Sequence, residues 1–285
     1  MTEDTDRSRV QIPPGPNTYP IDEDSHMTKV NSPQDAEAII QKLPCDMGIH
    51  RTSRKCTLKG PEAVTEDFSP NKPVLIDEVY PDEFSLEETQ RRILENTRDL
   101  IRYQKPVVSV GGDHSVSFPV IKALKEKRPD MELVWMDAHV DLKQKLDSHV
   151  SHDVVVRELI KQNLFTPDEV TFVGTTRIDK DEEEFLQDHE IDIYEPDDIE
   201  EFRREFENNE QPRYLSIDID VLEKSSAPGT GYPDGELSLE QVKTLIHQVS
   251  PTHGDIVEVA PELDNKGKTT NNAEAILSQL LKTLA

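Results

Sequence analysis

Two short acidic motifs and one further histidine supply six side chains of the kind that bind metal ions: His114, Asp137, His139, Asp141, Asp218 and Asp220. Within residues 137–141 and 218–220 these side chains recur two positions apart, a spacing that points them the same way at the end of a strand. Four carboxylates with no basic residue inside the motifs repel one another, and two divalent cations would cancel their charge. Oxygen-rich ligation with one imidazole for each ion favours Mn²⁺ over Zn²⁺, and two such ions lower the pKa of a shared water molecule. The pattern predicts a site with two Mn²⁺ ions that prepares a nucleophile for hydrolysis.

Each aspartate also has a simpler interpretation. Asp is common in the turns that end strands and at the N-caps of helices. A turn or a cap needs only one such residue, so this interpretation suits any single aspartate better than the whole set. The six residues together, at these spacings, favour the metal site.

Alternating strand and helix patterns position these motifs. Capping boxes at residues 85–88 and 238–241 begin helices that have an apolar face. Strands are expected at 106–110, 132–136, 170–173, 213–217 and 255–259, the last containing Glu258, and further helices at 116–127, 154–164 and 273–284. This alternation predicts an α/β fold, a three-layer α/β/α arrangement with a central parallel sheet. Ligands bind outside the carboxyl ends of such strands, where His114 and both acidic motifs lie.

The first 35 residues differ from the rest of the chain. Residues 1–35 hold five prolines among polar residues and show no sustained helix or strand period. Such a stretch is typical of a tail or a loosely docked arm. Residues 36–285 are therefore expected to form the catalytic domain.

Charge and composition exclude several kinds of partner. The chain has 32 Lys and Arg against 58 Asp and Glu, a net charge of −26, which repels nucleic acid and an anionic membrane surface. It has no run of about 18 apolar residues, and its first ten residues are acidic and polar, so we expect a soluble cytoplasmic protein. Cys45 and Cys56 are too few for a disulfide scaffold and too far apart for a CxxC motif, and are expected to be reduced thiols.

The acidity itself has two interpretations. A strongly negative surface would keep a halophilic protein hydrated and dispersed in a salt-rich cytoplasm, where charge repulsion is screened. The same charge would also secure solubility at ordinary salt concentrations. The sequence leaves both interpretations open.

Five segments carry a family resemblance: Gly-Gly-Asp-His-Ser at 111–115, Asp-Ala-His-Val-Asp at 137–141, Ser-Ile-Asp-Ile-Asp at 216–220, Ala-Pro-Gly-Thr-Gly at 227–231 and Val-Glu-Val at 257–259. In this order they resemble the ureohydrolase family of arginases and agmatinases over roughly residues 38–285. The resemblance implies an α/β/α fold with a binuclear manganese site that hydrolyses a guanidinium-type group to an amine and urea. It also implies a homo-oligomer, either a trimer or a hexamer.

The resemblance implies a ligand set for each ion. One ion would be held by His114, Asp137, Asp141 and Asp218. The other would be held by His139, Asp137, Asp218 and Asp220. Asp137 and Asp218 would then bridge the two ions.

Two further residues match catalytic positions of the family. Glu258 matches the glutamate that pairs with the substrate guanidinium, and a carboxylate is the natural partner of a planar cation. His152 matches the proton-shuttling histidine, and a near-neutral pKa suits delivery of a proton to a leaving amine. A His at this place could instead only neighbour the start of a helix, and His149 is the competing donor.

The substrate is the least determined part of the prediction. Residues 141–143, followed by Ser151-His152, resemble archaeal agmatinases and, distantly, formimidoylglutamases, whereas arginases carry Asn at the position of Lys143. Agmatine is therefore the expected guanidino substrate, ahead of arginine. Lys143 could instead bind the carboxylate of a guanidino acid or of formimidoylglutamate, or it could lie exposed.

Three departures from the family pattern bear on substrate choice. Asp153 stands where the family usually has Gly or Ala, Glu223-Lys224 replaces Asp-Pro, and Tyr232 replaces a Thr. None of them removes a metal ligand. A catalytically silent metal-binding regulatory relative is the alternative of another class, which the intact ligands and both catalytic candidates disfavour. The acidic motifs are also the wrong signature for a deacetylase of the related fold.

Overall fold

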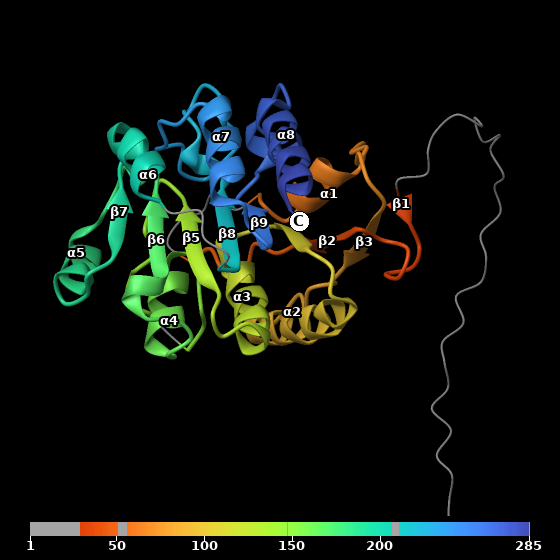
Figure 1. Cartoon of the computed structure of the whole chain (residues 1–285), viewed down its shortest axis with the longest axis horizontal. Helices are drawn as coiled ribbons and strands as arrows, with labels where there is room; N and C mark the ends of the chain where they lie inside the picture. The colour runs from red at the N-terminus through yellow and green to blue at the C-terminus, as the bar shows by residue number, and fades with distance from the viewer. Residues whose placement is uncertain (1–28, 51–55, 147, 207–210, 285) are drawn as a thin grey trace, which may run out of the picture.

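One parallel sheet organises the chain (Figure 1). The computed structural model describes residues 29–50, 56–146, 148–206 and 211–284, and within them the strands follow the order β1-β3-β2-β4-β9-β8-β5-β6-β7, every neighbouring pair parallel. The strands are β1 Lys29–Val30, β2 Ala38–Leu43, β3 Val74–Glu78, β4 Val107–Gly111, β5 Glu132–Met136, β6 Val170–Val173, β7 Asp192–Tyr194, β8 Arg213–Asp218 and β9 His253–Val257. The predicted central parallel sheet is confirmed.

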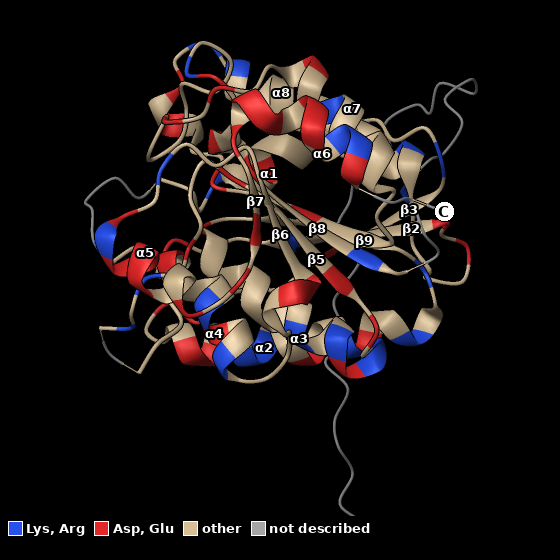
Figure 2. Cartoon of the chain, turned by 60° about the vertical axis from the view of Figure 1, so that its left-hand side comes forward, with Lys and Arg blue, Asp and Glu red and all other residues tan. Residues whose placement is uncertain are grey.

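Helices cover both faces of the sheet. They are α1 Gly60–Thr65, α2 Leu86–Leu100, α3 Ser117–Lys127, α4 Val155–Lys161, α5 Lys180–Gln187, α6 Ile199–Glu205, α7 Leu239–Val249 and α8 Lys268–Thr283. Helices α1, α6, α7 and α8 lie on one face, and α2, α3, α4 and α5 lie on the other (Figures 1 and 2). This arrangement confirms the three-layer α/β/α fold. Among the described residues, no helix is both long and apolar enough to cross a membrane.

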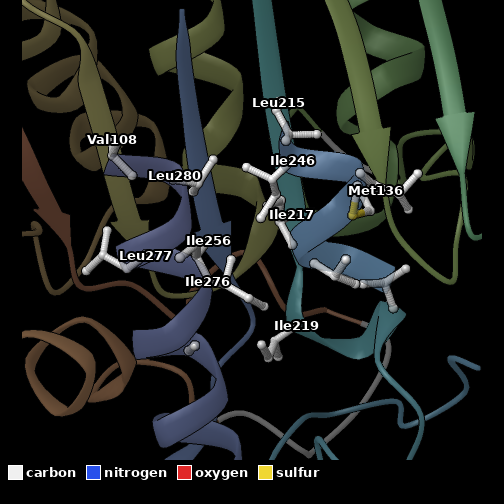
Figure 3. Close-up of a cluster of buried hydrophobic side chains, with 14 of the residues drawn as sticks. Val108, Met136, Leu215, Ile217, Ile219, Ile246, Ile256, Ile276, Leu277 and Leu280 are labelled. Atoms are coloured by element: carbon white, nitrogen blue, oxygen red, sulfur yellow. The ribbon is translucent and has the colours of Figure 1, made fainter. Parts of the chain in front are cut away.

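The two faces of the sheet bury two separate apolar clusters. Along β5, Val134 and Met136 pack in one cluster and Leu133 and Trp135 in the other, because successive strand residues point to opposite faces. A strand covered on both faces reads as a continuous apolar block, which is why β5 and β6 match their predicted bounds. Figure 3 shows part of the first cluster, where α7 and α8 pack against β8 and β9.

Several predicted boundaries differ from the structure; the helix expected at 154–164, for example, ends at Lys161. Strand β9 ends at Val257, so the expectation that Glu258 lies inside the last strand is wrong. Glu258 has a φ of +63°, which no extended strand adopts. Helix α8 begins at Lys268, before the predicted start at residue 273, and its first turn is tied down by Asp264, which accepts a hydrogen bond from the amide of Thr269.

Sequence patterning missed several elements, most of them short or partly exposed, but also β2, whose six residues are all buried. Strands β2, β3 and β7 and helices α1, α5 and α6 were not predicted. Of the expected tail, residues 1–28 lie outside the described residues, while Lys29 and Val30 form the edge strand β1 beside β3. Asp and Glu residues, red in Figure 2, occur on helices of both layers and are frequent on α5.

Candidate active site

Four neighbouring strands bring the chemistry-bearing residues to one edge of the sheet. Strands β4, β9, β8 and β5 are adjacent in that order, although they lie far apart in the sequence. Asp218 is the last residue of β8, and the other residues of the set follow the carboxyl ends of these strands: His114, Glu258, Asp220, Asp137, His139 and Asp141. The six predicted metal ligands and Glu258 therefore meet at the carboxyl edge, as the pattern of parallel strands indicates.

His114 lies at the centre of a first ligand group. Its Nδ1 atom is 3.2 Å from Oδ2 of Asp137, 3.2 Å from Oδ2 of Asp141 and 3.3 Å from Oδ2 of Asp218. The imidazole is 1% exposed, and Nδ1 has no hydrogen-bond partner. A buried nitrogen facing three carboxylates in this way is arranged as the ligands of a cation are.

A second group forms around His139. Its Nδ1 atom is 3.3 Å from Oδ1 of Asp137 and 3.1 Å from Oδ2 of Asp220. Asp137 thus directs one oxygen toward each group, which is the geometry of a bridging ligand. Asp218 pairs with His114 of the first group, and its bridging role remains a prediction.

Asx turns account for the spacing of two residues. Asp137 accepts a hydrogen bond from the amide of His139 at 2.7 Å, and Asp218 accepts one from the amide of Asp220 at 2.8 Å. A short carboxylate bonding the backbone two residues on turns the chain at the strand end. The side chains converge through these turns, not through the strand alternation that the sequence suggested.

A buried polar row orients His114. Its Nε2 atom lies 2.8 Å from the hydroxyl of Ser216, and that hydroxyl donates to Asp255 at 2.7 Å, so Ser216 accepts from Nε2 and the lone pair of the imidazole is on Nδ1. The ring of Trp135 stacks on the imidazole at 4.0 Å, and its Nε1 donates to Asp137 at 3.1 Å. Sequence reasoning missed these residues. The signal was there, because Ser216 and Asp255 are polar residues inside strands that are buried along their length.

The carboxylates of this cluster carry an excess of negative charge. Burial, followed by repulsion from Asp137, raises the pKa of Asp141 to about 7. Burial also raises the pKa of Asp220 to about 7, and it raises the pKa of Asp218 well above its usual range, with help from the neighbouring carboxylates. In the described part of the chain, these four aspartates form their ion pairs with histidines. This donor set fits divalent cations that favour oxygen ligands.

A close backbone approach positions the turn after β4. A Cβ atom at Gly112 would lie 1.8 Å from the carbonyl oxygen of Cys45, so only glycine fits there. The carbonyl of Gly112 accepts a hydrogen bond from the amide of Glu258 at 2.7 Å, which joins the ends of β4 and β9. The glycines of the first motif therefore bring Glu258 beside His114.

His152 and Glu258 form a buried pair beside the metal ligands. Nδ1 of His152 lies 3.6 Å from Oε1 of Glu258, and that oxygen accepts a hydrogen bond from the amide of His114 at 2.9 Å. Burial lowers the pKa of His152, but contact with Glu258 outweighs it and raises the pKa to about 9. This is above the near-neutral value that the sequence suggested. Nε2 of His152 is buried without a hydrogen-bond partner.

A cavity of about 220 Å³ opens beside these groups. Besides metal ligands, it is lined by Lys143, His152, Asp153, Arg177, Asp179, Glu182, Thr230, Tyr232 and Glu258. The ring of Tyr232 lies 5.8 Å from that of His139 and 6.4 Å from that of His152. His149, the competing proton donor, is half-buried and does not line the cavity.

Lys143 lies in the wall of this cavity. Its side chain is 19% exposed and forms an ion pair with Asp179, so the alternative that it lies exposed is wrong. Glu223, one of the departures from the family pattern, lies away from the cavity, where its carboxylate accepts a hydrogen bond from Ser226. Asp153 and Tyr232 remain as departures that bear on substrate choice.

Comparison with known proteins gives the geometry a context. The family model described as "Arginase family" matches residues 36–282. The chain is 32% identical to an agmatinase of Bacillus subtilis over 182 residues, 61% of this chain and 62% of that protein. It is 30% identical to a guanidinopropionase of Pseudomonas aeruginosa over 193 residues, 62% of this chain and 60% of that protein. The matches therefore span less than two thirds of the length of either relative. The crystal structure of formimidoylglutamase from Bacillus subtilis is similar in fold, with a TM-score of 0.80 and 19% identity over 94% of each chain.

Proposed function

Because this chain belongs to the arginase family, we propose that it hydrolyses the guanidino group of agmatine, giving putrescine and urea, with two Mn²⁺ ions. The observation that carries the proposal is Asp137, one carboxylate shared by two ligand groups beside a cavity that also holds Glu258 and His152. A colorimetric urea assay with Mn²⁺ over a panel of guanidino compounds tests it. We expect agmatine to be hydrolysed ahead of arginine and the guanidino acids. Urea release from none of them would overturn the proposal.

The metal ions would occupy the two ligand groups. One group comprises His114, Asp137, Asp141 and Asp218, and the other comprises His139, Asp137, Asp218 and Asp220. When bound, the two ions would lower the pKa of a water molecule and so make it a nucleophile near neutral pH. Mn²⁺ is proposed because carboxylates outnumber imidazoles in both groups.

Glu258 and His152 would act on the substrate directly. The Glu258 carboxylate is 8% exposed and held by the amide of His114, so it is fixed in position to pair with a guanidinium group. His152 lies beside it with a pKa of about 9, so it carries a proton at neutral pH. From there it would deliver that proton to the leaving amine.

Replacing Glu258 by glutamine tests the guanidinium contact. The change keeps the shape but removes the charge, and a charged hydrogen bond of this kind corresponds to about 10- to 100-fold in kcat/KM. KM should rise with little change in kcat, because a pair that exists in the ground and transition states alike contributes uniform binding. Glu262→Gln, on an exposed carboxylate outside the cavity, is the matched control and should leave both constants unchanged. Equal kinetics for the two variants would reject the role of Glu258.

Replacing Lys143 by alanine separates the candidate substrates. Agmatine ends in an amine and needs no cation there, so we expect its kcat/KM to change less than about threefold. A guanidino acid or formimidoylglutamate bound through Lys143 would instead lose most of its turnover. Lys145→Ala is the control, since Lys145 pairs with Glu158 outside the cavity. A large loss of agmatine hydrolysis in Lys143→Ala alone would count against agmatine.

Location and assembly complete the proposal. A cytoplasmic location fits Cys45 and Cys56, both of which are free thiols. A trimer or hexamer fits the exposure of apolar side chains between β3 and α2, where Tyr80 is 72% and Phe84 95% exposed. Sedimentation as a monomer at micromolar concentration would contradict the oligomer.

The net charge of −26 supports a salt-rich cytoplasm. If the protein is halophilic, its free energy of unfolding should rise from low to multimolar KCl, because salt screens the repulsion between carboxylates that destabilises the compact state. Thermal unfolding followed by circular dichroism at both salt concentrations measures this. A melting temperature that does not rise would leave solubility as the reason for the acidity.

A further inference from the structure

The wall of the cavity carries charges that the proposed chemistry does not use. They are two cations and three carboxylates: Lys143, Arg177, Asp153, Asp179 and Glu182. Glu182 is engaged by the backbone, because it accepts hydrogen bonds from the amides of Leu142 at 3.2 Å and Asp179 at 2.8 Å. The wall has a net negative charge, and the arrangement of its cations decides what the far end of a substrate meets.

Asp179 binds both cations of this wall. Its Oδ2 atom pairs with Nζ of Lys143, and its Oδ1 atom lies 3.2 Å from Nε of Arg177. Arg177 also lies 3.4 Å from Asp234. The Lys143 side chain is 19% exposed, so water screens its pair with Asp179 less than it screens a surface pair. Each cation therefore already has a carboxylate partner before a substrate enters.

We propose that Asp179 is a specificity-determining residue of this site, because it neutralises Lys143 and Arg177 and so selects guanidino compounds whose far end is an amine over those that end in a carboxylate. This inference rests on the proposed function. A substrate carboxylate would have to displace Asp179 from Lys143 and would leave that charge beside Glu182. A substrate ammonium meets the net negative wall without displacing anything.

Asparagine is the replacement that isolates the charge of Asp179. Asp179 is the N-cap of α5 and shares a capping box with Glu182. Asparagine caps a helix about as well as aspartate, so Asp179→Asn keeps the start of α5 while removing the charge that pairs with Lys143. Arg177 keeps its contact with Asp234. Asp179→Ser is a second variant of the same design, since serine also caps helices well.

The test compares agmatine with 4-guanidinobutyrate, a guanidino acid of similar length. We expect the ratio of the kcat/KM for agmatine to that for the acid to fall about 10- to 100-fold in Asp179→Asn, and in Asp179→Ser, because agmatine loses a favourable charge and the acid gains Lys143 as a partner. Asp181→Asn is the matched control, because Asp181 lies 3.8 Å from Lys143 and does not line the cavity. Its ratio should change less than about threefold.

A double variant separates the charge effect from a structural one. In Asp179→Asn with Lys143→Ala the freed lysine is gone, so the ratio should return toward the wild-type value, whereas general damage to the cavity would not be repaired. An unchanged ratio in both folded Asp179 variants, or a double variant that recovers nothing, would overturn the inference. Wild-type enzyme that prefers 4-guanidinobutyrate would instead refute agmatine as the substrate. The kinetics of the wild type alone give this result, so the two failures are distinguished.

Discussion

Asp137→Ala should abolish urea release and reduce bound manganese from two ions per chain toward none. Asp137 directs Oδ2 toward His114 and Oδ1 toward His139, so its loss removes a ligand from both groups at once. It would also remove the acceptor of the Trp135 indole and of the His139 amide, both of which hold the site in shape. Elemental analysis of protein grown with Mn²⁺ measures the metal directly.

Two companion variants make this measurement specific. Asp220→Ala touches only the group around His139 and should lose one ion. Asp218→Ala distinguishes the two arrangements, since loss of both ions indicates a bridge and loss of one indicates a ligand of the His114 group alone. Wild-type protein without any transition metal, or a fully active Asp137→Ala variant, would refute the binuclear site.

Local sequence predicted the parts of the site that local structure builds. The strands that lead to His114, Asp137 and Asp218 are buried on both faces and are therefore mostly apolar, which makes their ends visible in the sequence. Parallel strands end at one edge, so the convergence of these motifs follows from the fold class alone. The elements that were missed, such as β7 and α6, are short or half exposed and carry no such contrast.

Features that depend on distant contacts could not be predicted. The adjacency of β4, β9, β8 and β5 is a property of the sheet order, and no local pattern states that β9 inserts between β4 and β8. Trp135 faces Ser216, and Ser216 faces Asp255, only in the register of β5, β8 and β9. The pairing of Lys143 with Asp179 joins residues 36 positions apart and decides whether the lysine is available to a substrate.

His152→Asn should lower kcat by roughly 10²–10⁴-fold with little change in KM, because asparagine keeps a polar group in the same place but cannot donate a proton to the leaving amine. The backbone amide of His152 donates to the carbonyl of Gly48 at 3.1 Å, and the substitution leaves this bond intact. Bound manganese should stay at the wild-type level, since His152 faces Glu258 and belongs to neither ligand group. Steady-state kinetics together with elemental analysis check both points.

The pH profile distinguishes a proton donor from a residue that only shapes the cavity. Contact with Glu258 raises the pKa of His152 to about 9 against the effect of burial, so the protonated form is fully present below that value and is lost as pH rises through it. The kcat/KM of the wild type, which reports the free enzyme, should therefore fall above about pH 9, and this limb should be absent in His152→Asn. His149→Asn is the matched control, three residues earlier and outside the cavity, and should keep both turnover and the limb. Near-normal turnover in His152→Asn would assign the donor role to His149 or to water. Only a group that supplies the transferred proton makes both kcat and the high-pH limb of kcat/KM depend on the same side chain.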